Sequence, residues 1–158
     1  MNDKEINTEI KMITKLTTEI KLAMKARDSV RLTTLRCVMS DAKNIAIADK
    51  RKDTTSADVV VAVTKGIKQR KDSHESYVSA GRTDLADIEK IEMDILTEFQ
   101  PKQLTELDIA EIVDDIIKTI QMPTKKDMGK VMGIVMQKME KGTADGKLIS
   151  KIVGSKLK

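Results

Sequence analysis

The chain has 158 residues, of which 40% are hydrophobic, 34% are charged and only 1% are aromatic. Its aliphatic content is sufficient for a packed core, which argues against a wholly disordered chain. The single cysteine and single histidine exclude a disulfide framework and a Cys/His zinc cluster, so we expect no metal site.

The sequence carries no signal for a membrane or a secretory route. No apolar run approaches the roughly 20 residues that a transmembrane helix needs. The first residues include two acids and precede no continuous apolar segment, unlike a secretory signal. We therefore expect a reduced, cytoplasmic protein that does not associate with a membrane.

Apolar residues at steps of three and four predict four helices within residues 1–100. The stripes of the first, second and fourth helices are Ile6, Ile10, Ile13, Leu16, Ile20 and Met24; Leu32, Leu35, Met39, Ala42 and Ala46; and Ile88, Ile91, Ile95 and Phe99. In the third helix, the run Val59–Val63 has the composition of a strand. The polar caps before it and the charged stretch after it favour a helix that continues to Ala80.

Capping residues set the expected helix boundaries. Asp28, Thr83, and either Thr55 or Ser56 can accept a hydrogen bond from a free N–H group at a helix start. Gly81 suits the left-handed residue that closes the third helix.

Pro101 ends the fourth helix, and residues 100–104 form the expected joint between two domains. Thr105 and Asp108 have the spacing of a capping box before a strongly amphipathic fifth helix. Pro123 ends that helix, Thr124 starts a sixth that runs to about residue 140, and a last helix spans about 147–157. The sequence thus predicts an all-α fold, with an N-terminal domain of about four helices over residues 1–100 and a C-terminal three-helix domain over residues 101–158.

The net charge of +4 is concentrated near the C-terminus. From residue 116 onward ten lysines face three acidic residues, a net charge of +7 over 43 residues. Such a density favours polyanions, although lysines also simply cover exposed helix faces. The candidate nucleic-acid-binding residues are the lysines of the last helices: Lys125, Lys126, Lys130, Lys138, Lys141, Lys147 and Lys151.

The scarcity of aromatic residues limits how nucleic acid could be bound. Tyr77 and Phe99 cannot form a platform on which single-stranded bases stack, so we expect contacts to the backbone of a duplex or a tRNA. Lys125 and Lys126 lie at a predicted helix start, whose free N–H groups favour phosphate.

Gly129 and Gly133 lie four residues apart inside a predicted helix, where each costs about 0.8–1 kcal/mol relative to alanine. A close approach of a neighbouring helix would explain both, and a close approach of an RNA backbone is the alternative. The apolar residues around them predict a buried stripe: Met128, Val131, Met132, Val135, Met136 and Met139.

The sequence offers little for catalysis. We expect Cys37 to be a buried thiol and His74 to lie at the edge of an apolar stripe, and no phosphate-binding glycine loop is present. A basic cluster at residues 68–71 is interpreted as a solvated face with ion pairs four residues apart. Arg36, Lys43 and Lys50, seven residues apart, share one helix face and are interpreted as solvent-exposed. We expect no stand-alone enzyme and no cofactor.

Seven stretches, in their order and spacing, resemble the YqeY-like family of bacterial proteins: Met24–Asp28, Leu32–Arg36, Ile67–Ser73, Ala80–Leu85, Pro101–Leu104, Lys126–Gly133 and Ala144–Ser150. The likeness covers about residues 12–158 and leaves residues 1–11 as an extension. The sequence departs from the family's pattern at Gln100, where leucine is usual, and over residues 136–142, which lack the usual proline.

The resemblance implies an all-α, two-part fold. The family's region is similar to the tail of the B subunit of the tRNA-dependent glutamyl/aspartyl amidotransferase, which helps to hold the tRNA. Members therefore often carry the label of carbon–nitrogen ligase activity with glutamine as amido-N-donor, although that enzyme's chemistry belongs to other domains and a separate subunit. Lys126, Gly129, Lys130 and Gly133 match the shared motif.

Together, the lysines and the resemblance lead us to expect a non-catalytic accessory protein. Its partner would be tRNA or a tRNA-handling protein complex. The alternative is a helical protein-interaction module with no RNA role.

Overall fold

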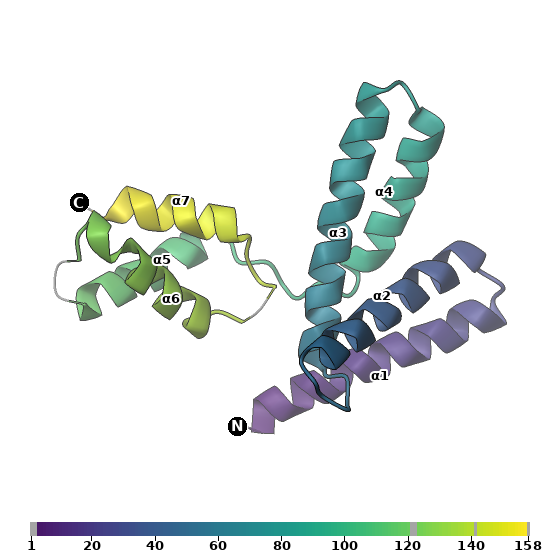
Figure 1. The fold of residues 1–158 in the computed structure, drawn as a ribbon, viewed down its shortest axis with the longest axis horizontal. Helices are drawn as coiled ribbons and strands as arrows, with labels where there is room; N and C mark the ends of the chain where they lie inside the picture. Colours follow the sequence, from purple (N-terminus) through teal and green to yellow (C-terminus); the bar gives the residue numbers. More distant parts are fainter. Residues whose placement is uncertain (1–2, 121–122, 141, 158) are drawn as a thin grey trace. The chain divides into compact units, whose positions relative to one another are not determined.

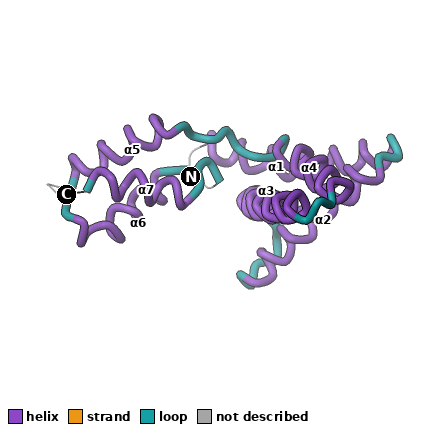
Figure 2. The backbone as a smooth tube through the Cα atoms, turned by 90° about the horizontal axis from the view of Figure 1, so that it is seen from above, coloured by secondary structure: helices purple, strands orange, loops and turns teal. Residues whose placement is uncertain are grey.

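A computed structural model describes residues 3–120, 123–140 and 142–157, with side chains from Met12 onward. Within these residues the chain is all-α and contains no strand (Figures 1 and 2). Contacts divide it into two compact units, Met1–Gln100 and Pro101–Lys158. No helix in the described part of the chain is both long and apolar enough to cross a membrane.

The N-terminal unit consists of two helical hairpins. α1 (Asp3–Lys25) and α2 (Ser29–Ala48) form the first, and α3 (Ser56–Ser79) and α4 (Thr83–Thr97) form the second. Both α1 and α2 pack against α3, and α2 also contacts α4, so the hairpins meet near the start of α3 and diverge from there (Figure 1).

The hairpins share one core at their junction. Each of the four helices contributes a fully buried residue, and the turn after α4 adds one more: Leu16, Leu35, Val59, Leu96 and Phe99. Burying a large aliphatic or aromatic side chain stabilises a fold by about 1.5–3 kcal/mol. The junction therefore holds the unit together.

Most of the expected caps are confirmed. Asp28 accepts a hydrogen bond from Arg31 N at 3.0 Å, and Thr55 forms a reciprocal capping box with Asp58. The prediction for Thr83 is wrong by one residue: Arg82 occupies the cap position without a side-chain hydrogen bond, and Thr83 is the first helical residue.

Three helices of the N-terminal unit end in a residue of left-handed conformation. Gly81 closes α3 as expected, with φ of 71°, whereas Arg27 and Lys50 close α1 and α2 with φ of 57° and 56°. In each case the next N–H donates to a carbonyl five residues back: Asp28 to Ala23, Arg51 to Ala46, and Arg82 to Tyr77. A residue with a Cβ atom loses roughly 1–2 kcal/mol in this conformation, and glycine avoids that cost.

Several predicted core positions are exposed instead. Met24, Ile88 and Ile91 have exposed fractions of 51%, 49% and 52%. The buried side of α4 is the side that carries Ala86 and Leu96, and nothing described covers the neighbouring isoleucines. Cys37 is also exposed, so the expectation of a buried thiol is wrong.

The C-terminal unit is a three-helix bundle with its own core. α5 (Glu106–Thr119), α6 (Met128–Lys138) and α7 (Gly146–Lys156) each contact the other two. A short 3₁₀ helix, η1 (Lys125–Asp127), precedes α6, so the predicted helix from Thr124 is a 3₁₀ turn followed by an α-helix. Leu104 N donates to Thr143 O at 2.7 Å, which ties the segment before α5 to the segment before α7.

Candidate nucleic-acid interface

Six of the seven candidate lysines lie in the described residues, and all six are exposed. η1 carries Lys125 and Lys126, α6 carries Lys130 and Lys138, and α7 carries Lys147 and Lys151. Lys141 lies outside the described residues.

None of these six lysines forms an ion pair with a carboxylate of the described residues. Two other lysines of the unit do: Lys156 Nζ lies 2.6 Å from Asp114 Oδ1, and Lys118 Nζ lies 3.5 Å from Asp115 Oδ1. Two of the acids near the candidate lysines in sequence, Asp127 and Asp145, accept backbone hydrogen bonds instead, because they cap helices. The six ammonium groups therefore remain available to an external anion.

The α7 lysines form a row on one side of the helix. Lys147, Lys151 and Gly154 are spaced i, i+4, i+7, opposite the side on which Ile149 and Val153 are buried. A Cβ atom on Gly154 would lie 3.8 Å from the side chain of Met128, the first residue of α6. The row therefore ends against the start of α6, next to η1.

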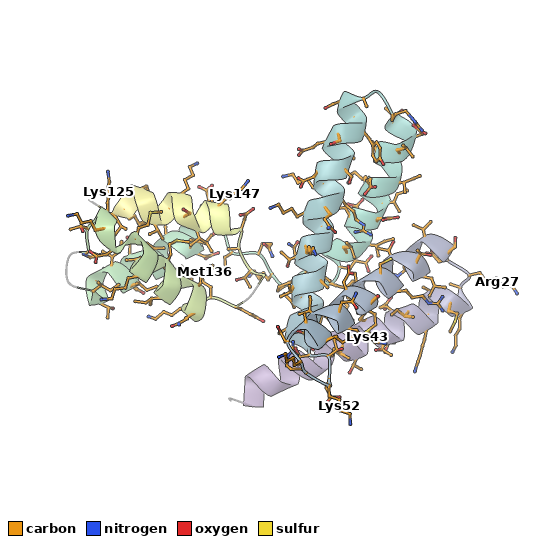
Figure 3. All side chains as sticks on the ribbon, in the orientation of Figure 1. Arg27, Lys43, Lys52, Lys125, Met136 and Lys147 are labelled. Carbon is orange, nitrogen blue, oxygen red and sulfur yellow. The ribbon has the colours of Figure 1, made fainter. Side chains whose placement is uncertain are left out.

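The lysines of η1 lie close to this end of the row. Lys125 and Lys147 extend to the same side of the unit, near opposite ends of α7 (Figure 3). Lys126 and Lys130 remain four residues apart across the boundary of η1 and α6. Lys138 lies about 12 Å further along α6 than Lys130, at a rise of 1.5 Å per residue. The lysines of η1 thus lie near the C-terminal end of α7, Lys147 lies near its N-terminal end, and Lys138 lies in the last turn of α6.

A carboxylate of the protein already lies at the N-terminus of the sixth helix, where we expected a phosphate site. The carboxylate of Asp127 accepts hydrogen bonds from Thr124 N at 2.8 Å and from Thr124 Oγ1 at 3.2 Å. A phosphate at that turn would have to displace this carboxylate, which carries the same sign of charge. The carboxylate therefore weakens the attraction of this turn for phosphate, and the nearest cations are the ammonium groups of Lys125 and Lys126.

The expected close approach of a helix to Gly129 and Gly133 is also wrong. A Cβ atom built on either glycine would have no described neighbour within 4 Å. Both glycines are exposed and share one face of α6 with Met136, which is 53% exposed although we expected it to be buried. The face of α6 that carries the two glycines is therefore open.

The remaining chemical candidates stay apart from this interface. His74 is half-buried on α3, and no cluster of His, Cys, Asp or Glu in the described residues could hold a metal ion. In the basic segment at residues 68–71, Arg70 pairs with Glu92 of α4 at 2.8 Å. Lys68 and Lys71 form no ion pair with the described residues, so the expected pairs four residues apart are not present there.

Comparison with known proteins identifies the family. The family model of the YqeY-like proteins matches residues 13–157. The chain belongs to the YqeY-like family. The matched segment spans nearly the whole chain and includes both helical units.

Fungal relatives of this YqeY-like protein carry the name "Altered inheritance of mitochondria protein 41, mitochondrial". The protein of Saccharomyces cerevisiae strain YJM789 is 34% identical over 73% of this chain, and the chain spans 65% of that relative's length. The Kluyveromyces lactis protein is 40% identical over 56% of the chain and 48% of its own length. The Pyrenophora tritici-repentis protein is 28% identical over 92% of the chain and 82% of its own length.

These names contradict one expectation from the sequence. We expected a cytoplasmic protein, whereas relatives at 28–40% identity are named mitochondrial proteins. The expectation depended on the absence of transmembrane and secretory patterns, and neither pattern distinguishes the cytoplasm from the mitochondrion.

Proposed function

We propose that this YqeY-like protein is a non-catalytic accessory protein that binds the phosphate backbone of folded RNA, tRNA above all, through the lysines of η1 and α7. The observation that carries the proposal is the set of exposed lysines without a carboxylate partner in the described residues. A lysine that is paired with a carboxylate attracts phosphate less than a free lysine does. When a free lysine contacts the phosphate backbone, it releases a counterion from the RNA, and this release favours binding.

The open face of α6 supports the same proposal. Because neither Gly129 nor Gly133 has a described neighbour, helix packing does not account for the two glycines. A surface without side chains lets a sugar–phosphate backbone approach the helix closely, with Lys130 beside it. The tRNA is proposed from the resemblance to the amidotransferase tail, and the mitochondrial names of the relatives support a mitochondrial place of action.

A salt titration tests the proposal. The full chain is titrated against labelled tRNA at 50 and 200 mM salt. Each phosphate contact adds about 0.9 to the slope of log Kd against log salt concentration. With four contacts, binding should therefore weaken by about a hundredfold between these two conditions. No binding at 50 mM salt would contradict the proposal, and a protein partner retained after nuclease treatment would favour the interaction module.

A pair of matched variants locates the site. Lys151→Glu should weaken binding by about tenfold or more, because a repelling charge replaces a phosphate contact. Lys118→Glu makes the same charge change in the same unit, at a lysine that already pairs with Asp115. It should change affinity by about twofold at most. If both variants lost the same affinity, the loss would come from net charge alone, and the proposed site would be wrong.

A further inference from the structure

The N-terminal unit contains a second concentration of positive charge, which the proposed function does not use. Residues 12–52, which include most of the α1/α2 hairpin, hold ten basic and four acidic side chains. Residues 53–99, which include the α3/α4 hairpin, hold six basic and ten acidic side chains. The nearly neutral first hundred residues thus contain two hairpins of opposite charge.

Most of the described cations in the first hairpin form no ion pair. Seven are exposed and form no ion pair with a carboxylate of the described residues; we call them the hairpin basic surface, and they are Lys21, Lys25, Arg27, Arg36, Lys43, Lys50 and Lys52. Of the four acids, Glu19 pairs with Arg31, Asp49 pairs with Arg51, and Asp28 caps α2. Only Asp41 is left without such a contact in the described residues.

The hairpin basic surface extends along the whole hairpin. Arg36 and Lys43 are spaced by seven residues, so they lie on one side of α2 about 10 Å apart, and Lys50 follows in the turn after the helix. Arg36 Nη2 lies 3.8 Å from Met24 Sδ, which places the start of this row beside the last turn of α1. Arg27 lies at the outer tip of the hairpin, Lys43 midway and Lys52 at the opposite end (Figure 3).

Two residues of this surface occupy positions that suit glycine better. Arg27 and Lys50 adopt left-handed φ angles, and neither side chain packs into the core, because both are exposed. The α3/α4 hairpin makes the same turn with Gly81. A cation near a helix C-terminus interacts favourably with the helix dipole, so a structural role is the competing explanation, and the two explanations predict different effects of substitution by glycine.

We propose that the hairpin basic surface is a second binding surface for the phosphate backbone of the same RNA. The proposal rests on the proposed function for the choice of ligand and on the free cations for the site. A duplex or a folded RNA needs only cations spaced along its backbone. Two backbone-binding surfaces on one chain strengthen each other when both reach one RNA.

The burial of the apolar side of α2 argues for RNA over an anionic bilayer. A helix that lies on a membrane inserts an apolar face into the lipid. In α2 that face, which includes Leu35, Val38, Ala42 and Ala46, is already buried in the protein core. The outward side of α2 carries mostly cations and polar residues, and its large exposed apolar residues, Val30 and Ile47, lie 17 residues apart and form no continuous apolar face.

The test compares hairpin variants of the full chain, titrated against labelled tRNA over a series of salt concentrations. The variant with Arg27→Gly and Lys50→Gly should bind about tenfold or more weakly at 50 mM salt, and the slope of log Kd against log salt should fall by about two. Its melting temperature should stay the same or rise, because glycine fits the left-handed turns. Lys43→Gln, in the middle of α2, should weaken binding with no change in either turn.

A matched control removes the same charge from the other hairpin. Lys65→Gln combined with Lys90→Gln takes two exposed cations from α3 and α4 and should leave affinity within about twofold of the wild type. If this control weakens binding as much as the glycine variant does, net charge alone explains both losses, and the proposal for the hairpin basic surface is wrong.

The outcomes separate this proposal from the proposed function. If Lys151→Glu weakens binding and all hairpin variants bind as the wild type, the second surface is wrong and the first stands. If only the hairpin variants weaken binding, the site on η1 and α7 is wrong and the hairpin surface stands. If the wild type binds vesicles of anionic lipid but no tRNA, both are wrong. A loss of binding in the glycine variant but not in Lys43→Gln would also overturn the hairpin surface.

Discussion

The two hairpins of the N-terminal unit have the same architecture and use charge in opposite ways. The α3/α4 hairpin and the turn after it hold five carboxylates in ion pairs: Asp58, Asp84, Glu92, Asp94 and Glu98. Among the side chains that the structure describes in the α1/α2 hairpin, from Met12 onward, most cations form no ion pair, and only Arg31 and Arg51 pair with carboxylates, each with two of them. Half of the acids of residues 53–99 are therefore held in ion pairs, whereas seven of the ten cations of residues 12–52 are exposed and form no ion pair with the described residues.

The turns show the same contrast. The α3/α4 hairpin uses glycine where the backbone is left-handed, which is the choice that favours stability. The α1/α2 hairpin uses Arg27 and Lys50 at equivalent positions. Comparing the hairpins therefore separates side chains that the fold requires from side chains that the fold merely tolerates.

The largest expected effect is at Asp58, which joins the hairpins. This buried carboxylate accepts hydrogen bonds from Arg51 Nη2 at 2.6 Å and from Thr55 N at 2.7 Å. Asp58→Ala should lower the free energy of unfolding by about 3 kcal/mol, since it breaks the cap of α3 and leaves Arg51 without its main partner. Urea unfolding measures the loss. Asp41→Ala, at an exposed acid with no partner in the described residues, should cost less than about 0.5 kcal/mol, and similar costs would contradict the contrast.

The same carboxylate should make stability depend on pH. Arg51 lowers the pKa of Asp58 from 3.8 to about 2 in the folded protein. Because the folded pKa is the lower one, this contribution of about 2 kcal/mol is fully present above pH 3.8 and is lost as the pH falls through 2. Urea unfolding at several pH values between 2 and 6 should show this slope in the wild type and a shallower one in Asp58→Asn. Equal slopes would rule out the pairing.

The turns give the next largest effect, with opposite signs in the two hairpins. Gly81→Ala should lower the free energy of unfolding by about 1 kcal/mol, because a Cβ atom disfavours a φ of 71°. Lys50→Gly should raise it by about 0.5–1 kcal/mol, since it relieves the same strain. Thermal unfolding of both variants tests the comparison. A loss of stability in Lys50→Gly would show that the lysine is required for the turn itself.

An effect of similar size is expected at the open face of α6. Gly133→Ala should stabilise the C-terminal unit by about 0.8–1 kcal/mol, because the added methyl group meets no described neighbour and alanine favours the helix. Thermal unfolding measures the gain. A destabilised variant would mean that the glycine is needed for packing after all.

The periodicity of apolar residues predicted the helices well, because amphipathic patterns and caps are local properties. Thr55, Thr105 and Gly81 act as expected. The same pattern could not tell which apolar stripes are covered. Ile88 and Met136 lie on good stripes and are exposed, because burial depends on a neighbouring helix that the local sequence does not specify.

The candidate site was predictable only in part. The excess of lysines near the C-terminus is visible in the sequence, but the choice of partner is not. Asp114 pairs with Lys156, 42 residues away, while Lys147 and Lys151 form no ion pair with the described residues. The charge contrast between the hairpins was hidden because the whole region is nearly neutral. Counting charges separately in each hairpin reveals it.

The central claim is that the free lysines of η1 and α7 bind RNA backbone, and its most direct test is the salt dependence of tRNA affinity for the wild type and Lys151→Glu. The account predicts a steep linear fall of log affinity with log salt, and a slope that is smaller by about one or more in the variant. A wild-type affinity that does not change with salt, or a variant with an unchanged slope, would contradict it.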